Sequence, residues 1–538
     1  MSSSMDASSS GGARAAIEDG RVVLGIELGS TRIKACLLGD DASAVLAVGS
    51  HAWENRFEDR MWTYSLDDVW SGVRAAYAAV AADAEERYGI RPTSFAAIGI
   101  SAMMHGYLAF DDEDRLLVPF RTWRNTTTGP AAAELTELFG TSIPLRWSIA
   151  HLHQAVLDGE PHIARVRFLT TLAGYVHWQL TGEKVLGVGD ASGMFPIDPT
   201  TRTWDADLVG RYDASTAGRL PVGGIGALLP QALVAGQTAG TLTAQGAALL
   251  DPTGDLRPGA ALCPPEGDAG TGMVATSSVA PRTGNVSAGT SIFAMIVLER
   301  PLSSVHLEID LVTTPAGRPV AMVHCNNGAN EFAAWVDLFR RFADLTGASA
   351  DADAVFESLL TEALAGEPDA GGLLAYNHLA GEPITGLTEG RPLFVRTPES
   401  RFTLANVMRA QVYGVFATLA LGMEVLTGEG VAVDRMFAHG GLFRTPGVAQ
   451  RFLAAALAAP VAVGESASEG GAWGVAVLAA YLPHASEMTL EAYLGAHVFR
   501  GAVVHTAEPD PGDVAGFATY LAHYRKGLAI EAAAVDAL

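Results

Sequence analysis

"RVVLGIELGSTRIKACLLGDD", at residues 21–41, holds the first clear structural pattern of the chain. Apolar residues run from Val22 to Ile26, a Gly-Ser-Thr turn follows, and a second apolar run reaches Leu38. Two apolar runs separated by a short polar turn that contains glycine are typical of a β-hairpin. Ordered structure is therefore expected to begin here, with two antiparallel strands.

The same layout occurs again at residues 284–298, "GNVSAGTSIFAMIVL". A Gly-Thr-Ser turn again separates two strand-like runs, and the two copies are much too far apart for a solenoid repeat. We infer two domains that each open with the same hairpin, and we place the boundary near residue 277.

Helical and strand-like patterns alternate along the rest of the chain, which favours an α/β fold. Helical spacing or a glycine-rich helix entry marks residues 66–89, 162–182, 409–430, 469–482 and 512–528, and strand-like runs mark residues 95–103 and 435–441. The expected organisation is a disordered Ser/Ala/Gly-rich tail at 1–20, one domain at 21–277, a second at 278–505, and a helical segment at 506–538.

The overall composition excludes several classes of function. The formal net charge is −24 at pH 7, which repels phosphate backbones and makes nucleic acid an improbable partner. The tail does not resemble a signal peptide, and no apolar run is long enough and free enough of charge to predict a membrane span. The cysteines are three in number, with no CxxC pair, so neither a disulfide framework nor a zinc site is expected, and a reducing cytoplasm fits.

The first hairpin turn carries groups suited to phosphate. Gly29 lets the backbone turn closely, Ser30 and Thr31 offer hydroxyl and N–H groups, and Lys34 adds a positive charge. Glu27, at the end of the first strand, could hold Mg²⁺ through water. The alternative is a plain hairpin whose turn happens to contain these residues.

The second hairpin weakens that alternative, because Gly289 and Thr290 repeat the turn. Two glycine pairs, at 440–441 and 470–471, stand at a strand end and a helix entry. A nucleotide base and ribose could lie flat against such backbone, although a helix cap or a turn is the simpler interpretation of either pair alone.

A second candidate segment is "SAMMHGYLAFDDEDRLLVPFRTWRNT" at residues 101–126. His105 could donate a hydrogen bond to a substrate hydroxyl, Trp123 could present a flat apolar face to a sugar, and Asn125 could bind hydroxyls. The alternative is that Met103 and Met104 are core residues and that His105 is an ordinary loop histidine.

One carboxylate, Asp268, stands between glycines in "CPPEGDAGTGM" at residues 263–273. The dipeptide Gly-Asp is common in turns, so the residues by themselves are compatible with a turn-forming aspartate on thin, flexible backbone. A carboxylate at a site of phosphoryl transfer could instead accept the proton of an attacking hydroxyl.

Seven motifs in this order carry a resemblance, namely "GIELGSTRIK", "MMHG", "TWRN", "GDAGTGM", "SAGTS", "HGG" and "EGGAWG". The chain resembles the FGGY family of carbohydrate kinases, and "MHG" is similar to the xylulokinase branch. The likeness spans roughly residues 22–500. It implies two actin-like (ribonuclease H-like) α/β domains with a central cleft, ATP and Mg²⁺ as cofactors, a small sugar as substrate, and a homodimer as the common assembly.

The resemblance also implies roles for residues of this chain. Asp268 matches the catalytic base, and Met104 and His105 match the sugar-binding pair, beside Trp123 and Asn125. Positions that contact the nucleotide are matched by Gly29, Ser30, Thr31, Lys34, Gly289, Thr290, Gly328, Gly440, Gly441 and Thr445.

The chain departs from the family pattern at three places. Glu27 stands where the family usually has Asp, and the extra methylene shifts the carboxylate by about 1.5 Å. Asn125 stands where relatives often have Asp, which leaves the sugar preference open. His151 and His153 are two residues apart and so do not share a helix face; they could meet a substrate or lie in a loop.

The main hypothesis is an ATP-dependent kinase of a ketopentose such as xylulose. Alternatives within enzymes are kinases of ribulose, a deoxy-ketose, a sugar acid or glycerol. The rival from another class is a non-catalytic switch protein that uses ATP or a sugar to change shape, and Asp268 argues against it because a switch needs no base beside a sugar.

Overall fold

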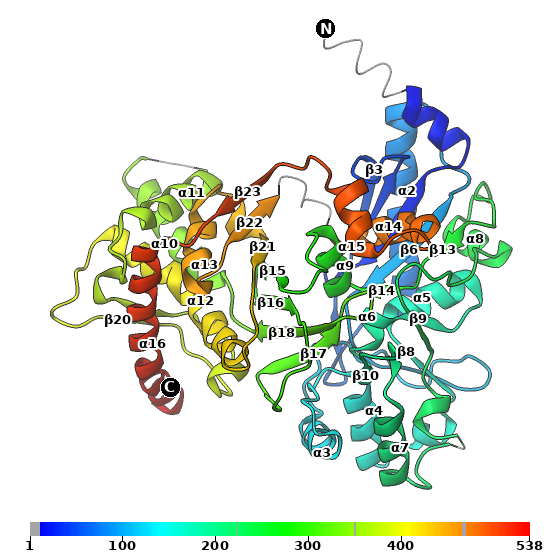
Figure 1. Cartoon of the computed structure of the whole chain (residues 1–538), viewed down its shortest axis with the longest axis horizontal. Helices are drawn as coiled ribbons and strands as arrows, with labels where there is room; N and C mark the ends of the chain where they lie inside the picture. The colour runs from blue at the N-terminus through cyan, green and yellow to red at the C-terminus, as the bar shows by residue number, and fades with distance from the viewer. Residues whose placement is uncertain (1–10, 222, 349–350, 465–469, 538) are drawn as a thin grey trace. The chain divides into compact units, whose positions relative to one another are not determined.

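A computed structural model describes residues 11–221, 223–348, 351–464 and 470–537 (Figure 1). These residues group into two compact units. Among the described residues, unit 1 comprises 11–221, 223–279, 311–320 and 470–501, and unit 2 comprises 280–310, 321–348, 351–464 and 502–537. The alternation of strands and helices confirms the predicted α/β class.

Unit 1 is built on a six-stranded sheet with the order β13-β6-β1-β2-β3, in which β14 also pairs with β6. The strands are β1 Val23–Leu28, β2 Arg32–Leu38, β3 Val45–Ala52, β6 Ala97–Ala102, β13 Ala261–Leu262 and β14 Glu266–Gly267. Strands β1 and β2 are the predicted hairpin, with Glu27 opposite Lys34. Strands β13 and β14 run parallel to β6, which itself runs parallel to β1.

The helices of unit 1 cover this sheet and its extensions. They are α2 Leu66–Tyr88, α3 Gly129–Phe139, α4 Ser148–Leu157, α5 Leu172–Thr181, α6 Val188–Ala191, α7 Ala206–Ser215, α8 Ala244–Leu250, α9 Asp268–Ala275, α14 Gly470–Tyr481 and α15 Leu490–Tyr493. Short strand pairs join β4 Arg56–Glu58 to β5 Met61–Thr63, β7 Leu108–Phe110 to β8 Phe168–Thr170, β9 Val185–Gly187 to β12 Gln231–Leu233, and β10 Ile197–Asp198 to β11 Thr203–Trp204.

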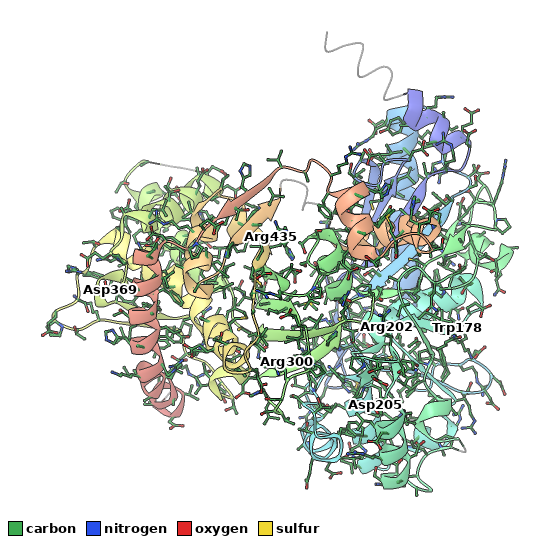
Figure 2. All side chains as sticks on the ribbon, in the orientation of Figure 1. Trp178, Arg202, Asp205, Arg300, Asp369 and Arg435 are labelled. Atoms are coloured by element: carbon green, nitrogen blue, oxygen red, sulfur yellow. The ribbon has the colours of Figure 1, made fainter. Side chains whose placement is uncertain are left out.

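Local sequence explains where these helices begin and end. The hydroxyl of Ser65 accepts a hydrogen bond from the N–H of Asp68 at the start of α2, and Gly89 ends the helix in the left-handed conformation. The expected helix at 162–182 is wrong in its first half. A 3₁₀ turn and strand β8 precede α5, because β8 pairs with β7 to form part of an aromatic core in which Trp178 packs on Phe110 and Phe168. Trp178 is labelled in Figure 2.

Helix α14 belongs to unit 1, although the sequence analysis assigned its residues to the second domain. Glycines in two strands of the sheet explain this correction. A Cβ at Gly25 would lie 2.1 Å from the carbonyl oxygen of Ala472, and one at Gly99 would lie 2.4 Å from that of Val475. The helix backbone therefore rests directly on β1 and β6 (Figure 1).

The expectation of a disordered tail at 1–20 is wrong for its second half. Residues 11–18 form a helix, and Ala16 and Ile17 are buried in the core of unit 1. The guanidinium of Arg14 donates to the carbonyl oxygen of Tyr88 at the end of α2. Residues 1–10 lie outside the described part of the chain.

Unit 2 contains most of a seven-stranded sheet with the order β17-β18-β16-β15-β21-β22-β23. The strands are β15 Thr283–Ala288, β16 Ile292–Val297, β17 Ile309–Thr313, β18 Pro319–Cys325, β21 Arg435–His439, β22 Val461–Gly464 and β23 Val504–Ala507, with a separate pair, β19 Leu374–Tyr376 and β20 Leu393–Val395. The helices are α10 Asn330–Leu345, α11 Ala352–Glu362, α12 Leu404–Gly428, α13 Val448–Leu457 and α16 Pro511–Ala537. The second predicted hairpin is confirmed as β15 and β16.

Helix α12 is long and apolar enough by length and composition to cross a membrane. In the fold, however, 72% of its apolar window is buried, as in a core helix of unit 2. The three cysteines, Cys36, Cys263 and Cys325, are buried free thiols.

Candidate active site

Three parallel strands of unit 1 end at the same edge of the sheet. The last residues of β1 and β6 are paired, Leu28 with Ala102, and Ala102 also pairs with Gly267 at the end of β14. Chain leaving these strands enters the Gly29–Thr31 turn, the Met103–His105 segment and helix α9. The carboxyl edge of a parallel sheet is where α/β proteins place ligands, so the topology gathers three predicted motifs at one candidate site.

Asp268 is the first residue of helix α9, so the alternative of a turn-forming aspartate does not hold. Its Oδ1 accepts hydrogen bonds from the backbone N–H of Met104, at 3.1 Å, and of Ala269, at 3.0 Å. Burial raises the pKa of Asp268, and these N–H groups oppose that rise. The carboxylate is therefore fixed next to the predicted sugar-binding segment, at a helix end that favours negative charge.

Two further buried carboxyls lie behind Asp268. One oxygen of Asp190 accepts from the hydroxyl of Thr171 at 2.6 Å, while its Oδ1 has no hydrogen-bond partner among the described residues. Glu266 accepts from the N–H groups of Gly189 and Asp190 at 3.2 and 2.9 Å. Burial raises the pKa of both acids to about 8, and the charge of a neighbouring carboxylate adds to each rise.

These two acids were missed by the sequence analysis. They stand in "GVGDASG" and "PPEGDAG", and a charged residue among small and apolar neighbours is the signal that could have found them. Their raised pKa values keep them mainly protonated at neutral pH, so Asp268 does not face two fully charged neighbours.

Glu27 faces α14 as well as the site. A Cβ at Gly471 would lie 2.2 Å from its Oε1, so only glycine leaves room for this carboxylate. Burial raises the pKa of Glu27 to about 7, with a further contribution from Asp268, while Lys34 and the backbone N–H of Ala472 oppose the rise. Packing against Glu27 thus explains Gly471, whereas a Cβ at Gly470 would meet nothing within 4 Å.

The first hairpin turn is held rigidly by its carbonyl groups. The indole of Trp53 donates to the carbonyl of Gly29 at 2.7 Å, and the Tyr64 hydroxyl donates to that of Ser30 at 2.6 Å. The backbone N–H of Trp53 donates to the carbonyl of Thr31 at 3.2 Å. The side chain of Thr31 is exposed, as a phosphate contact requires.

His105 adopts a left-handed backbone conformation, with φ of 69°. Its Nδ1 lies 3.2 Å from the carbonyl oxygen of Gly193, and its ring stacks on Trp147 with centroids 6.5 Å apart. Left-handed backbone is strained for a residue other than glycine and concentrates at functional sites. Met104 is buried beside it, and its N–H is one of the two groups that donate to Asp268.

The two other predicted sugar ligands have different surroundings. Trp123 is half-buried and packs against the core of unit 1. Asn125 is buried, and both amide hydrogens are used, with Nδ2 donating to the carbonyls of Trp62 at 2.8 Å and Thr122 at 3.0 Å. These bonds argue for a structural role of Asn125, and its sugar contact stays a prediction.

His151 and His153 lie in helix α4 and not in a loop, and both are buried. The ring of His151 lies near Tyr107, whereas His153 contacts Glu134 at 3.1 Å, so the two point in different directions as their spacing predicts. Burial lowers the pKa of His151 to about 3, so it is neutral at physiological pH.

In unit 2, four of the predicted nucleotide contacts lie together. The N–H of Gly328 donates to the carbonyl of Thr290 at 2.8 Å, and the N–H of Ala329 donates to that of Gly289 at 2.9 Å. Gly440, with φ of 111°, packs so closely that a Cβ would lie 2.2 Å from the carbonyl oxygen of Ala288. Gly441 follows in the next turn, and Thr445 is buried beyond it.

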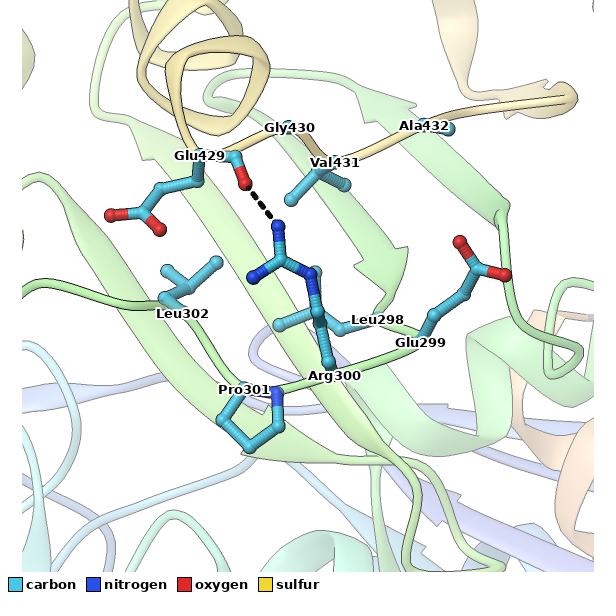
Figure 3. A pocket seen from close by; sticks show the side chains of 9 residues that line it. All are labelled: Leu298, Glu299, Arg300, Pro301, Leu302, Glu429, Gly430, Val431 and Ala432. Atoms are coloured by element: carbon cyan, nitrogen blue, oxygen red, sulfur yellow. Dashed lines mark hydrogen bonds between the residues drawn. The ribbon is translucent and has the colours of Figure 1, made fainter.

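The structure also has a small pocket elsewhere in unit 2, between the end of β16 and the end of α12 (Figure 3). Residues 298–302 and 429–432 line it, and the guanidinium of Arg300 donates to the carbonyl oxygen of Glu429 at 3.0 Å. It contains none of the predicted site residues. Among the described residues, no group of three His, Cys, Asp or Glu side chains could hold a metal ion.

Models of two protein domains match the chain. The N-terminal domain of the FGGY family of carbohydrate kinases matches residues 22–252, and the C-terminal domain matches residues 284–482. The chain is similar to a xylulose kinase of Haemophilus influenzae, with 22% identity over 431 residues that cover 78% of this chain and 82% of the relative.

Solved structures agree on the fold. A xylulose kinase from Lactobacillus acidophilus superposes with a TM-score of 0.78 at 16% identity, covering 95% of this chain and 98% of the other. A gluconate kinase from the same organism gives a TM-score of 0.75 at 16% identity, covering 94% and 97%. Together with the two domain models, these likenesses show that the chain belongs to the FGGY family of carbohydrate kinases, enzymes that transfer a phosphoryl group from ATP to a sugar.

Proposed function

We propose that the protein transfers the γ-phosphate of ATP to a hydroxyl of a ketopentose such as xylulose, with Asp268 as the general base. The observation that carries the proposal is the fixed position of Asp268, whose Oδ1 accepts from Met104 and Ala269 beside the Met104–His105 segment. The likeness to the Haemophilus influenzae xylulose kinase supports the choice of sugar.

The chemistry follows from the positions of these groups. Asp268 accepts the proton of the attacking hydroxyl as the new P–O bond forms and the bond from the γ-phosphorus to the bridging oxygen breaks, with ADP as the leaving group. The N–H partners of Asp268 hold the carboxylate in one orientation. Met104 and His105 orient the sugar. The nucleotide is bound in unit 1 by Gly29, Ser30, Thr31 and Lys34, and in unit 2 by Gly289, Thr290, Gly328, Gly440, Gly441 and Thr445.

Mg²⁺ fits this site as an ion shared with the nucleotide. Proteins usually bind Mg²⁺ through one or two carboxylates plus phosphates and water, and Glu27 is a buried carboxylate close enough to Asp268 for the two charges to interact. Glu27 would hold the ion through water, and the ion would neutralise charge on the transferring phosphate. Cytoplasmic location fits the buried thiols, and a homodimer remains part of the proposal.

A sugar acid is one alternative substrate class, because a gluconate kinase has the same fold over nearly the whole chain. Ribulose, a deoxy-ketose and glycerol remain in the same test. The switch protein receives no support from the comparisons and is not proposed.

The test is ADP release in the presence of ATP and Mg²⁺, across ketoses, polyols and sugar acids. We expect turnover with xylulose, and we expect Asp268→Asn to lower it by about 10²–10⁴-fold while ADP still binds. Asp205→Asn is the matched control, because Asp205 also accepts an N–H at a helix N-terminus of unit 1, that of Leu208 at 3.0 Å, but caps α7 (Figure 2). Turnover by Asp268→Asn at the parent rate would overturn the assignment of the base, and turnover with gluconate alone would replace the substrate.

A further inference from the structure

The loop after β18 carries Gly328 against the second hairpin turn. Besides the two backbone hydrogen bonds to Gly289 and Thr290, a Cβ at Gly328 would lie 2.3 Å from the carbonyl oxygen of Gly289. Any movement of this loop therefore moves the turn that the proposed function assigns to ATP. The question is what fixes the loop.

A buried asparagine binds the loop from the other side. Asn377 is 3% exposed and follows strand β19. Its Nδ2 donates to the carbonyl oxygen of Asn327 at 3.1 Å and to that of Gly328 at 2.9 Å. Both amide hydrogens of Asn377 thus bind successive backbone carbonyls, those of Asn327 and Gly328. No other neutral side chain of this size supplies two such donors from one atom.

Asn327 makes the reciprocal contacts, and we call Asn327 and Asn377 together the asparagine brace. Its Oδ1 accepts from the N–H groups of Leu379 and Ala380, each at 2.9 Å. Its Nδ2 donates to the carbonyl of Ala380 at 3.1 Å and to the carboxylate of Glu382 at 3.1 Å. Each of the two segments therefore holds the backbone of the other through one asparagine.

The segment that carries Asn377 is itself anchored to the C-terminal helix α16. The Tyr376 hydroxyl donates to the carbonyl of Tyr524 at 2.9 Å, and the Tyr524 hydroxyl lies 3.1 Å from Nε2 of His378. The rings of Tyr376 and Tyr524 stack with centroids 4.4 Å apart. The asparagine brace is thus anchored to helix α16 through Tyr376 and His378, and it can hold Gly328 in one position.

We propose that Asn377 is a positioning residue for nucleotide binding, which acts by holding the Gly328 loop against the Gly289–Thr290 turn. This inference rests on the proposed function, because it takes that turn to be part of the ATP site. An amide is required at this position. A carboxylate would face two carbonyl oxygens, and a methyl group would leave both carbonyls unpaired in a buried place.

The experiment compares Asn377→Ala and Asn377→Ser with the parent. KM for ATP and for the sugar are measured, and the affinity for ADP with Mg²⁺ is measured by calorimetric titration. We expect Asn377→Ala to raise KM for ATP and Kd for ADP about tenfold, as the loss of two buried hydrogen bonds implies, with KM for the sugar unchanged. Asn377→Ser keeps one donor and should give a smaller rise.

Asn406→Ala is the matched control. Asn406 is another buried asparagine of unit 2 that ties loops together, with Nδ2 donating to the carbonyl of Arg401 at 2.8 Å and Oδ1 accepting from the N–H of Glu367 at 2.7 Å. Its replacement should lower the melting temperature and leave ADP affinity unchanged.

Two failures can be told apart. If both Asn377 variants bind ADP as tightly as the parent while their melting temperatures fall as in Asn406→Ala, the asparagine is only structural and the inference is overturned. If the parent itself binds no ADP, the proposed function is overturned along with it.

Discussion

Replacing Gly471 by Ala should destabilise the protein only while residue 27 is Glu. The new Cβ would lie 2.2 Å from Oε1 of Glu27 and 2.7 Å from its Cδ, so the carboxylate must move by more than 1 Å. Overpacking of this kind, with the hydrogen bond from Ala472 lost, costs about 3 kcal/mol. Alanine in a helix recovers about 1 kcal/mol relative to glycine, which leaves a net loss of about 2 kcal/mol.

The Glu27→Asp background should remove this loss. Shortening the acid by one methylene withdraws the carboxylate by about 1.5 Å, which turns the clash into an ordinary contact of about 3.7 Å. The one close contact that remains is with the Thr271 hydroxyl, at 2.9 Å from the new Cβ. Its unfavourable energy is set against the higher helix propensity of alanine. Gly471→Ala should then be nearly neutral.

The assay is urea-induced unfolding of the parent, the two single variants and the double variant, followed by tryptophan fluorescence. The double-mutant cycle should give a coupling free energy of about 2 kcal/mol between positions 27 and 471. A coupling below about 0.5 kcal/mol would mean that the Glu27 carboxylate does not occupy the space beside Gly471.

Three further predictions follow from the same structure. Asp268→Asn should lower kcat by about 10²–10⁴-fold while ADP affinity, measured by titration, stays within about twofold of the parent. The pKa of Asp190 is raised to about 8, so the protonated acid stabilises the fold at low pH, and this contribution is lost as pH rises towards 8. Asp190→Asn should therefore gain stability over the parent between pH 5 and pH 8 in urea unfolding. Parallel pH profiles of the two proteins would contradict this. Gly440→Ala should lower the free energy of unfolding by about 2 kcal/mol or more and weaken ADP binding, because φ at this position is 111° and the new Cβ would clash with Ala288. Gly441→Ala is the control: with nothing within 4 Å of its new Cβ, it should unfold like the parent.

Local patterns predicted much of the fold. Both hairpins, helix α2 with its Gly89 end, and helix α12 appear where periodicity and turn residues place them, because these signals act within a few residues of sequence. The pairing of Glu27 with Lys34 follows from the same hairpin.

Long-range packing decided what the sequence did not predict. Helix α14 joins the first sheet because Gly25 and Gly99, more than 370 residues earlier, leave room for its backbone. Asp190 and Glu266 come together only when α6 and β14 are placed side by side, so neither was recognisable as part of a carboxyl cluster. The helix at 11–18 is stabilised by burial of Ala16 and Ile17, which composition alone does not indicate.

The buried cysteines have a consequence for labelling chemistry. Burial raises the pKa of Cys263 and Cys325 above the usual thiol range, and Cys36 is buried in strand β2. Thiol reagents attack the thiolate, so the parent protein should behave towards maleimides almost as if it had no cysteine. A single cysteine introduced at an exposed position in each unit could then be labelled in the native background, and the distance between two such dyes could be followed as ATP and sugar are added.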